Sequence, residues 1–108
     1  MKTIVSILAL CLVASPALAR GNAAAGEAKA KSVCAACHGP DGNTPTTPEF
    51  PRLSGQYYDY LVRALNEYKS GARKNAVMAG QAQPLTGKEI EDLAAFYAAQ
   101  KGSLYTKR

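Results

Sequence analysis

Two cysteines and a histidine share one five-residue stretch, Cys34-Ala35-Ala36-Cys37-His38. The C-x-x-C-H spacing is typical of covalent attachment of a c-type haem. Two thiols that add to the two vinyl groups on one porphyrin edge need a short, fixed separation, and the next residue then lies beneath the iron. Cys34 and Cys37 are therefore predicted to form thioethers to haem, and the imidazole of His38 is predicted to bind the iron.

Structural zinc sites and thioredoxin-like redox sites also use a C-x-x-C pair. Zinc in a structural site takes four nitrogen or sulfur ligands, and apart from Cys11 the chain has no other cysteine or histidine. A thioredoxin-like motif follows a strand in a βαβ unit, whereas an alanine-rich helical pattern precedes Cys34. Haem attachment is the interpretation that the sequence favours.

Residues 1–19 have the pattern of a secretory signal peptide. Lys2 provides a positive start, Ile4 to Ala14 form an apolar run, and Ala17-Leu18-Ala19 is a small-x-small cleavage site. The apolar run is short for a transmembrane helix, and no later stretch is long and apolar enough to be one. We expect residues 20–108 to be exported to the periplasm as one domain, without a transmembrane segment after cleavage.

The exported domain would be small and mildly basic. The whole chain carries 13 Lys and Arg against 8 Asp and Glu, a net charge of +5. Loss of Lys2 with the signal peptide leaves twelve basic against eight acidic residues, or +4. This excess favours docking to an acidic partner, although it is as often a solvated surface. A domain of this size buries a modest core, so we expect haem to complete the core and the apoprotein to be unstable.

The first predicted helix spans residues 23–33, rich in strong helix formers and capped by Asn22. Gly26 lies inside it at a cost of about 1 kcal/mol relative to alanine, which the close crossing of another helix would justify. The second predicted helix spans residues 56–70, with Ser54 as its N-cap and Gly71 at its end.

The third predicted helix opens with the capping-box pattern Thr86-Gly87-Lys88-Glu89 and ends near Gly102. Residues 71–84 show no clear period, and no run alternates apolar and polar residues as a strand does. The sequence therefore predicts an all-α fold of three main helices joined by long loops. Loops of this length in a compact domain are usually functional, and wrapping a haem is such a function. The buried face of the third helix is predicted to include Ile90, Leu93, Ala94, Phe96 and Tyr97.

A six-coordinate haem needs a ligand on the face opposite His38, and residues 20–108 hold one methionine and no second histidine. Met78 is therefore the predicted second axial ligand, in a segment expected to be irregular; Lys74 is the other candidate. The Pro51 carbonyl is predicted to accept a hydrogen bond from the other ring nitrogen of His38, because ligating histidines usually donate that N–H.

Donors to the haem propionates are also required, and the sequence does not rank them. The candidates are Gln56, Tyr57, Tyr58, Arg63, Arg73 and Lys74.

Through the haem motif, Pro51-Arg52-Leu53-Ser54-Gly55, Met78 and an aromatic-bearing last helix, residues 20–100 resemble the class I c-type cytochromes. They are most similar to small bacterial periplasmic cytochromes c and to one half of the dihaem cytochromes. The resemblance implies the cytochrome c fold, with the first and last helices crossing at Gly26 against Phe96 or Tyr97. A single haem motif excludes a dihaem architecture within this chain.

The resemblance implies an electron carrier, not an enzyme. With His38 and Met78 both bound, one haem c iron would cycle between Fe(II) and Fe(III) and leave no position for a substrate. Two alternatives stay open: a haem subunit of a larger dehydrogenase or oxidase, and an open-iron protein that binds CO, NO or peroxide. A haem-free regulatory or metal-binding module is the remaining alternative.

The predicted partners are membrane or periplasmic redox proteins that dock transiently at the haem edge. We expect a monomer that binds no nucleic acid. Three basic side chains are candidates for steering the docking: Lys69, Arg73 and Lys74.

Overall fold

Five helices make up the computed structural model, which describes residues 21–102 and residue 104. They are α1 (Ala23–Val33), α2 (Ala35–His38), α3 (Tyr58–Ser70), α4 (Ala76–Ala82) and α5 (Gly87–Ala99). No strand occurs in the described part of the chain, which confirms the all-α prediction. The predicted signal peptide, residues 1–19, lies outside the described residues. Within them, no helix has the length and apolar character that a bilayer crossing requires.

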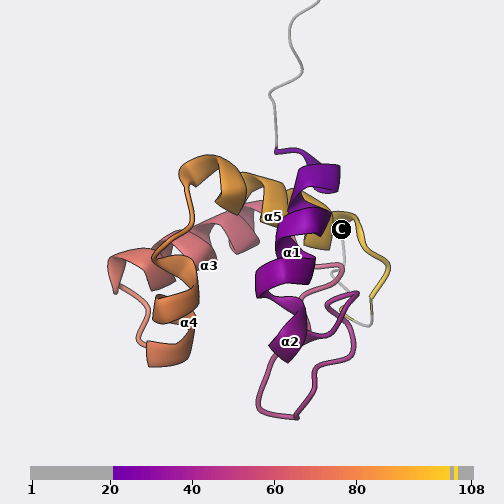
Figure 1. Cartoon of the computed structure of the whole chain (residues 1–108), viewed down its shortest axis with the longest axis horizontal. Coiled ribbons are helices and arrows are strands. Elements are labelled where there is room, and N and C mark those ends of the chain that lie inside the picture. The colour runs from indigo at the N-terminus through magenta and orange to yellow at the C-terminus, as the bar shows by residue number, and fades with distance from the viewer. Residues whose placement is uncertain (1–20, 103, 105–108) are drawn as a thin grey trace, which may run out of the picture.

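Helix α1 crosses α5, and this crossing is the most extensive contact between helices (Figure 1). Gly26 lies at the point of closest approach, where a Cβ atom would overlap the Asp92 carbonyl and touch Phe96. The predicted crossing is confirmed, with Asp92 and Phe96 as the neighbours of the glycine. Lys29 adds an ion pair to Glu89 across the two helices at 2.7 Å.

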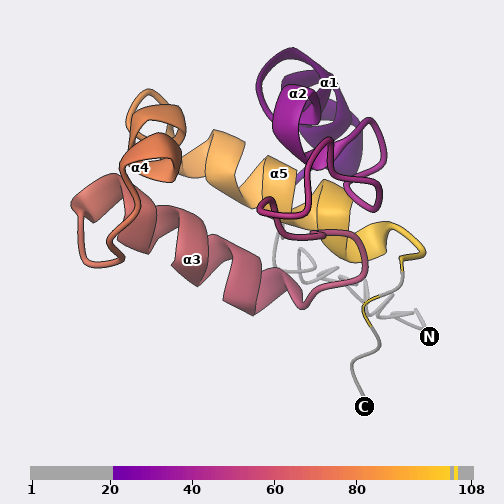
Figure 2. The same cartoon turned by 90° about the horizontal axis from the view of Figure 1, so that it is seen from below.

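Helix α3 packs beside α5, and the two helices run in opposite directions (Figure 2). Gly71 ends α3 in the left-handed conformation, with φ of 83°, as predicted. The beginning differs from the prediction, because the helix starts at Tyr58 and its N-cap is Tyr57. Ser54 is fully buried and donates its hydroxyl proton to the Asp41 carbonyl, so it is a loop anchor and not a helix cap.

The capping box at Thr86 is present, and α5 ends at Ala99, three residues before Gly102. The predicted buried face of α5 is confirmed, and its members are at most 6% exposed. One charged residue, Asp92, is buried among them at 5% exposure, where it accepts hydrogen bonds from the Asn22 backbone N–H and the Lys88 ammonium. The hydrophobic core consists of Ala30, Leu61, Ala64, Ala82, Leu85, Ile90, Leu93, Ala94, Phe96 and Tyr97.

The prediction of an irregular segment between α3 and the last helix is wrong. Residues Ala76–Ala82 form α4, and the Asn75 side chain caps its start by accepting a hydrogen bond from the Met78 N–H at 3.0 Å. Helix α4 stands on the same side of the α3–α5 pair as α2, but at the other end of it (Figures 1 and 2). The chain thus presents two short helices, one bearing His38 and one bearing Met78.

Candidate functional site

The two cysteines lie on a single helical turn that follows α1 directly. Cys34 is the C-cap residue of α1, and its N–H makes the last backbone hydrogen bond of that helix. Its carbonyl accepts hydrogen bonds from the Cys37 and His38 N–H groups at 3.2 and 3.0 Å. Residues three apart on a helix share one face, so both sulfur atoms belong to the same side of this turn. Both thiols are free and partly exposed. The turn therefore offers two thiols, close together and unpaired, at the edge of the core.

The imidazole of His38 is buried, at 5% exposure, and one of its nitrogens has a fixed partner. Nδ1 lies 2.8 Å from the carbonyl oxygen of Pro51. Because a carbonyl can only accept, Nδ1 must carry the proton, and the lone pair then lies on Nε2. This is the arrangement expected of a histidine that binds a metal through Nε2 and is oriented by a backbone carbonyl.

The loop between α2 and α3 holds Pro51 in place. The Gly42 carbonyl accepts hydrogen bonds from the Leu53 and Ser54 N–H groups at 2.7 and 3.2 Å. These bonds bring the two ends of the loop segment together. Gly42 has a φ of 71° and sits against the Tyr97 ring, where a side chain would collide. Its left-handed conformation and this close approach both require glycine. The His38–Pro51 hydrogen bond is thus supported by a loop that rests on α5.

Met78 is half-buried on α4, on a different element from His38. The two predicted axial ligands thus lie on two different short helices, α4 and α2. Because Met78 belongs to a short helix, its backbone and the direction of its side chain are better defined than they would be in an irregular loop. The signal in the sequence was Asn75, a preferred N-cap residue directly before an alanine-rich run.

Tyr97, predicted only as a buried residue of the last helix, also brings its hydroxyl to the site. Its hydroxyl is buried beside the Cys34 thiol and is the one buried side-chain polar atom, among the described residues, with no hydrogen-bond partner of standard geometry. Burial strongly raises the pKa of this hydroxyl, so it stays protonated and can donate. The Cys34 sulfur is a weak acceptor and lies close enough for a hydrogen bond from this hydroxyl, so Tyr97 links α5 to the turn that carries the two cysteines.

The thiol chemistry argues against a redox-active cysteine pair. Burial raises the pKa of the Cys34 thiol above its ordinary value, and the nearby Tyr97 hydroxyl and Lys29 ammonium only partly oppose this effect. Reactive cysteines of redox proteins have a lowered pKa instead, because the thiolate is the nucleophile. Cys34 is therefore a neutral thiol at pH 7 in the absence of a bound group.

The donor set fits a covalently attached haem. It comprises two free thiols on one helical turn, an imidazole with Nε2 available, and a thioether on a separate short helix. A zinc site fits less well, because the described residues contain no cluster of three or more His, Cys, Asp and Glu side chains arranged to hold a metal ion. Of the predicted propionate donors, Arg73 donates a hydrogen bond to the Tyr60 hydroxyl at 3.1 Å.

Comparisons with known proteins agree with this assignment. The family model described as cytochrome c matches residues 23–100. The chain is 44% identical over 103 residues to cytochrome c4 of Pseudomonas aeruginosa, a match that covers 95% of this chain and 50% of the relative. It is 43% identical over 84 residues to cytochrome c-554(548) of Halomonas halodenitrificans, covering 75% of this chain and 99% of that protein.

The fold is also found among solved structures. The crystal structure of reduced recombinant cytochrome c4 from Pseudomonas stutzeri superposes with a TM-score of 0.71 at 42% identity, over 78% of this chain and 48% of that chain. The chain spans about half the length of the cytochrome c4 relatives that it matches. Some other relatives are named for thiosulfate dehydrogenase or sulfide dehydrogenase.

Proposed function

The chain belongs to the cytochrome c family, and we propose that it carries single electrons on one haem c, with His38 and Met78 as the axial ligands of the iron. Haem c is the cofactor of this family, and it supplies a reversible Fe(II)/Fe(III) couple. In this proposal Cys34 and Cys37 hold the haem through thioether bonds. The role of the protein chain is then to bind and orient the haem and to shield it from solvent.

One observation carries the ligand assignment, namely the hydrogen bond from His38 Nδ1 to the Pro51 carbonyl at 2.8 Å. It fixes the tautomer, leaves Nε2 for the iron and makes the imidazole a stronger ligand. Pro51 is suited to this task because its ring restricts the backbone at the position that supplies the acceptor. A buried imidazole N–H needs an acceptor in any case, and what supports a ligand role is that this hydrogen bond leaves the lone pair of Nε2 for a metal.

Filled coordination favours a carrier over an enzyme. With His38 and Met78 both bound, no position on the iron is left for a substrate. The chain also has no second histidine, the residue most often used for acid–base catalysis. Both features support simple electron transfer, and a thioether ligand raises the reduction potential relative to more electron-donating ligand sets.

The cellular setting is part of the proposal. The signal-peptide pattern of residues 1–19 supports export to the periplasm, and a net charge of +4 after cleavage supports transient docking to acidic redox proteins, membrane-bound or soluble. We place a monomer there. The second candidate function is a tightly held haem subunit of a dehydrogenase, favoured by a relative that is named as the cytochrome subunit of sulfide dehydrogenase.

A redox titration of the purified, haem-loaded protein tests the proposal. We expect a single reversible one-electron transition and no turnover of peroxide. Size-exclusion chromatography of the protein from its native periplasm, monitored at the haem band, separates the two candidates. Elution as a small monomer supports the free carrier, co-elution with a dehydrogenase activity supports the subunit, and an irreversible couple or peroxide turnover contradicts both.

A further inference from the structure

Helix α4, which bears Met78, is fastened to α3 at both of its ends. Helix α3 is its principal helical neighbour, so the seven residues of α4 depend on α3 and on two short connections for their position. Only Ala82 of α4 is fully buried. A helix this short is not stable by itself in water, and its direction must therefore be set by the contacts at its ends.

The C-terminal end is held by Lys69, in the last turn of α3. Its ammonium donates to the Gln83 carbonyl at 3.2 Å and to the Leu85 carbonyl. Gln83, the C-cap residue of α4, returns a hydrogen bond from its side-chain amide to the Lys69 carbonyl at 3.0 Å. Three hydrogen bonds thus join the end of α3 to the C-cap of α4 and to Leu85 just after it, and two of them are made by a charged donor.

The N-terminal end is held by Arg73, two residues before the Asn75 cap. Its guanidinium carbon lies 5.1 Å from the centre of the Tyr68 ring and 5.9 Å from that of the Tyr60 ring. Nη1 also donates to the Tyr60 hydroxyl at 3.1 Å. These distances are within the range of cation–π attraction. The linker between α3 and α4 is therefore fixed by a side chain that lies back along α3.

These contacts change the interpretation of two basic residues. Lys69, Arg73 and Lys74 were all predicted from the sequence as candidates for steering a docking partner. The Lys69 ammonium binds two backbone carbonyls, and the Arg73 guanidinium lies against two aromatic rings. Both charges are therefore used in contacts within the protein. Lys74 alone of the three is exposed.

We propose that Lys69 and Arg73 are positioning residues for Met78, which fix α4 on α3 and so set the strength of the bond between the Met78 thioether and the haem iron. This inference rests on the proposed function, because it takes Met78 as the axial ligand. Loosening either end of α4 should weaken the bond between the Met78 sulfur and the haem iron. The thioether is a weak, neutral ligand, and it competes poorly for the iron once its position is no longer fixed.

The test is imidazole binding to the oxidised, haem-loaded protein, since imidazole can bind only where the methionine has been displaced. We expect Lys69→Met and Arg73→Ala each to bind imidazole about tenfold more tightly than wild type, as the loss of a charge-assisted contact implies. The far-red methionine–iron absorption band should weaken in parallel. Arg73→Lys should lie between Arg73→Ala and wild type, because it keeps the charge and loses the planar stacking.

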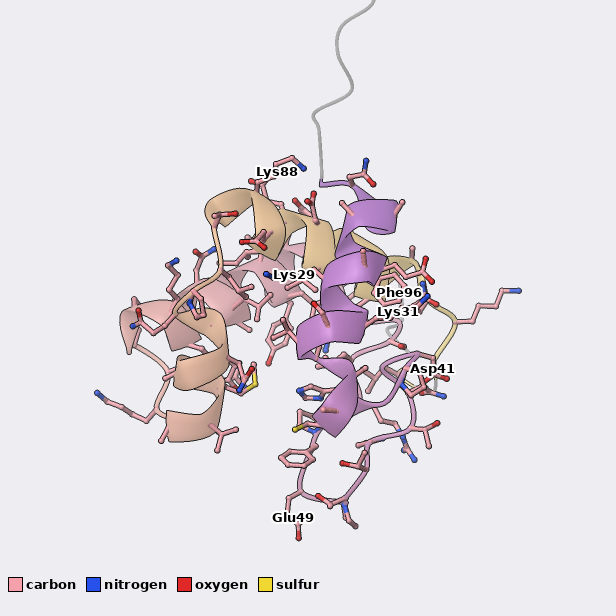
Figure 3. All side chains as sticks on the ribbon, viewed as in Figure 1. Lys29, Lys31, Asp41, Glu49, Lys88 and Phe96 are labelled. Atoms are coloured by element: carbon pink, nitrogen blue, oxygen red, sulfur yellow. The ribbon has the colours of Figure 1, made fainter. Side chains whose placement is uncertain are left out.

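Lys88→Met is the matched control. Lys88 projects from the first turn of α5 at the top of Figure 3, away from α4, and pairs with the buried Asp92 at 2.9 Å. Its loss removes the same charge and lowers thermal stability through the α1–α5 crossing. We expect it to leave imidazole affinity unchanged.

Two outcomes would overturn the inference. One is wild-type imidazole affinity and an unchanged far-red band in both Lys69→Met and Arg73→Ala. The other is an increase in Lys88→Met as large as in Lys69→Met, which would assign the effect to general loosening. A wild-type protein without the methionine–iron band would instead refute the ligand assignment in the proposed function, and the two failures are thus distinguishable.

Discussion

At the scale of single residues, the site combines strict local chemistry with one long-range hydrogen bond. Cys34, Cys37 and His38 lie within five consecutive residues, so their arrangement is fixed by one helical turn. The orientation of His38 depends on Pro51, thirteen residues later, through the 2.8 Å hydrogen bond. We therefore predict that the protein preforms the His38 side of the haem site and that the opposite side depends on Met78.

Substituting Met78→Ala should remove the sixth ligand without disturbing the fold. We expect a high-spin spectrum, and CO should then bind to the reduced protein, because the thioether no longer occupies the iron. Absorption spectra with and without CO provide the measurement. Val77→Ala is the matched control, since the neighbouring side chain is 59% exposed and should be dispensable. A Met78→Ala spectrum identical to wild type would refute the ligand assignment.

Much of the site could be predicted from the sequence, because its chemistry is local. The C-x-x-C-H spacing identifies three residues at once, and the scarcity of other histidines and methionines leaves Met78 as the candidate on the other side. The Pro51 carbonyl was also predicted, and the structure shows the hydrogen bond. The burial of Tyr97 was predicted from the helical period, but the position of its hydroxyl beside Cys34 was not. The buried Asp92 could not be predicted, because nothing in the local pattern distinguishes a buried carboxylate from an exposed one.

At the scale of elements, the crossing of α1 and α5 is the foundation of the fold. Gly26 permits the close approach, and Lys29 and Glu89 add an ion pair across it. Both helix starts were predictable from their caps, Asn22 and Thr86. Helix α4 was missed because seven residues are too few to show a helical period, and Gly80 within it lowers the helix propensity. The start of α3 was misplaced because Ser54, a good cap by type, is used to anchor the loop.

Substituting Gly26→Ala should destabilise the crossing. The new methyl group would overlap the Asp92 carbonyl, so the two helices must separate, at a cost of about 1–3 kcal/mol in the free energy of unfolding. Denaturant unfolding of the haem-loaded protein measures this loss. Gly87→Ala makes the same change in open space at the start of α5 and should not destabilise. Equal stability of Gly26→Ala and wild type would refute the packing role of Gly26.

The Lys29–Glu89 pair predicts a defined acid sensitivity. The Lys29 ammonium, together with the Thr86 N–H, lowers the pKa of Glu89 from 4.5 to about 2. Because the folded pKa is depressed, ionised Glu89 stabilises the fold above about pH 4.5, and this contribution is lost as the pH falls towards 2. Glu89→Gln should therefore be less stable than wild type at pH 7, and the difference should disappear over that window.

Unfolding midpoints measured across the acid range provide the comparison. Glu27→Gln is the control, because Glu27 belongs to an exposed ion pair within α1, with Lys31 at 3.0 Å, and such pairs contribute little. A difference between Glu89→Gln and wild type that is constant from pH 7 to about pH 2 would contradict the prediction.

At the scale of the whole molecule, the protein chain alone provides a small core of five helices. The largest fully buried side chains are Ile90, Leu93 and Ser54, and α4 adds to the core through Ala82. Haem is a large apolar body, and its burial should contribute stabilisation at about 25 cal/mol per Å² of apolar surface. We therefore expect the holoprotein to be much more stable than the apoprotein.

Replacing both thiols, Cys34→Ser with Cys37→Ser, should prevent covalent attachment and leave a largely unfolded chain at 37 °C. Far-ultraviolet circular dichroism of the exported variant measures the helix content. The oxidised and reduced wild-type holoproteins serve as references. A native helix content in the haem-free variant would show that the chain folds without its cofactor, contrary to this prediction.

The most direct test of the central claim, a covalent haem c whose iron is closed on both sides, is the optical spectrum of the exported and purified protein, with and without CO. We predict sharp reduced bands of a covalent haem, a weak far-red methionine–iron band in the oxidised state, and no change when CO is added. A CO-induced shift, or a high-spin spectrum in the wild-type protein, would mean an open iron and would contradict the assignment of an electron carrier.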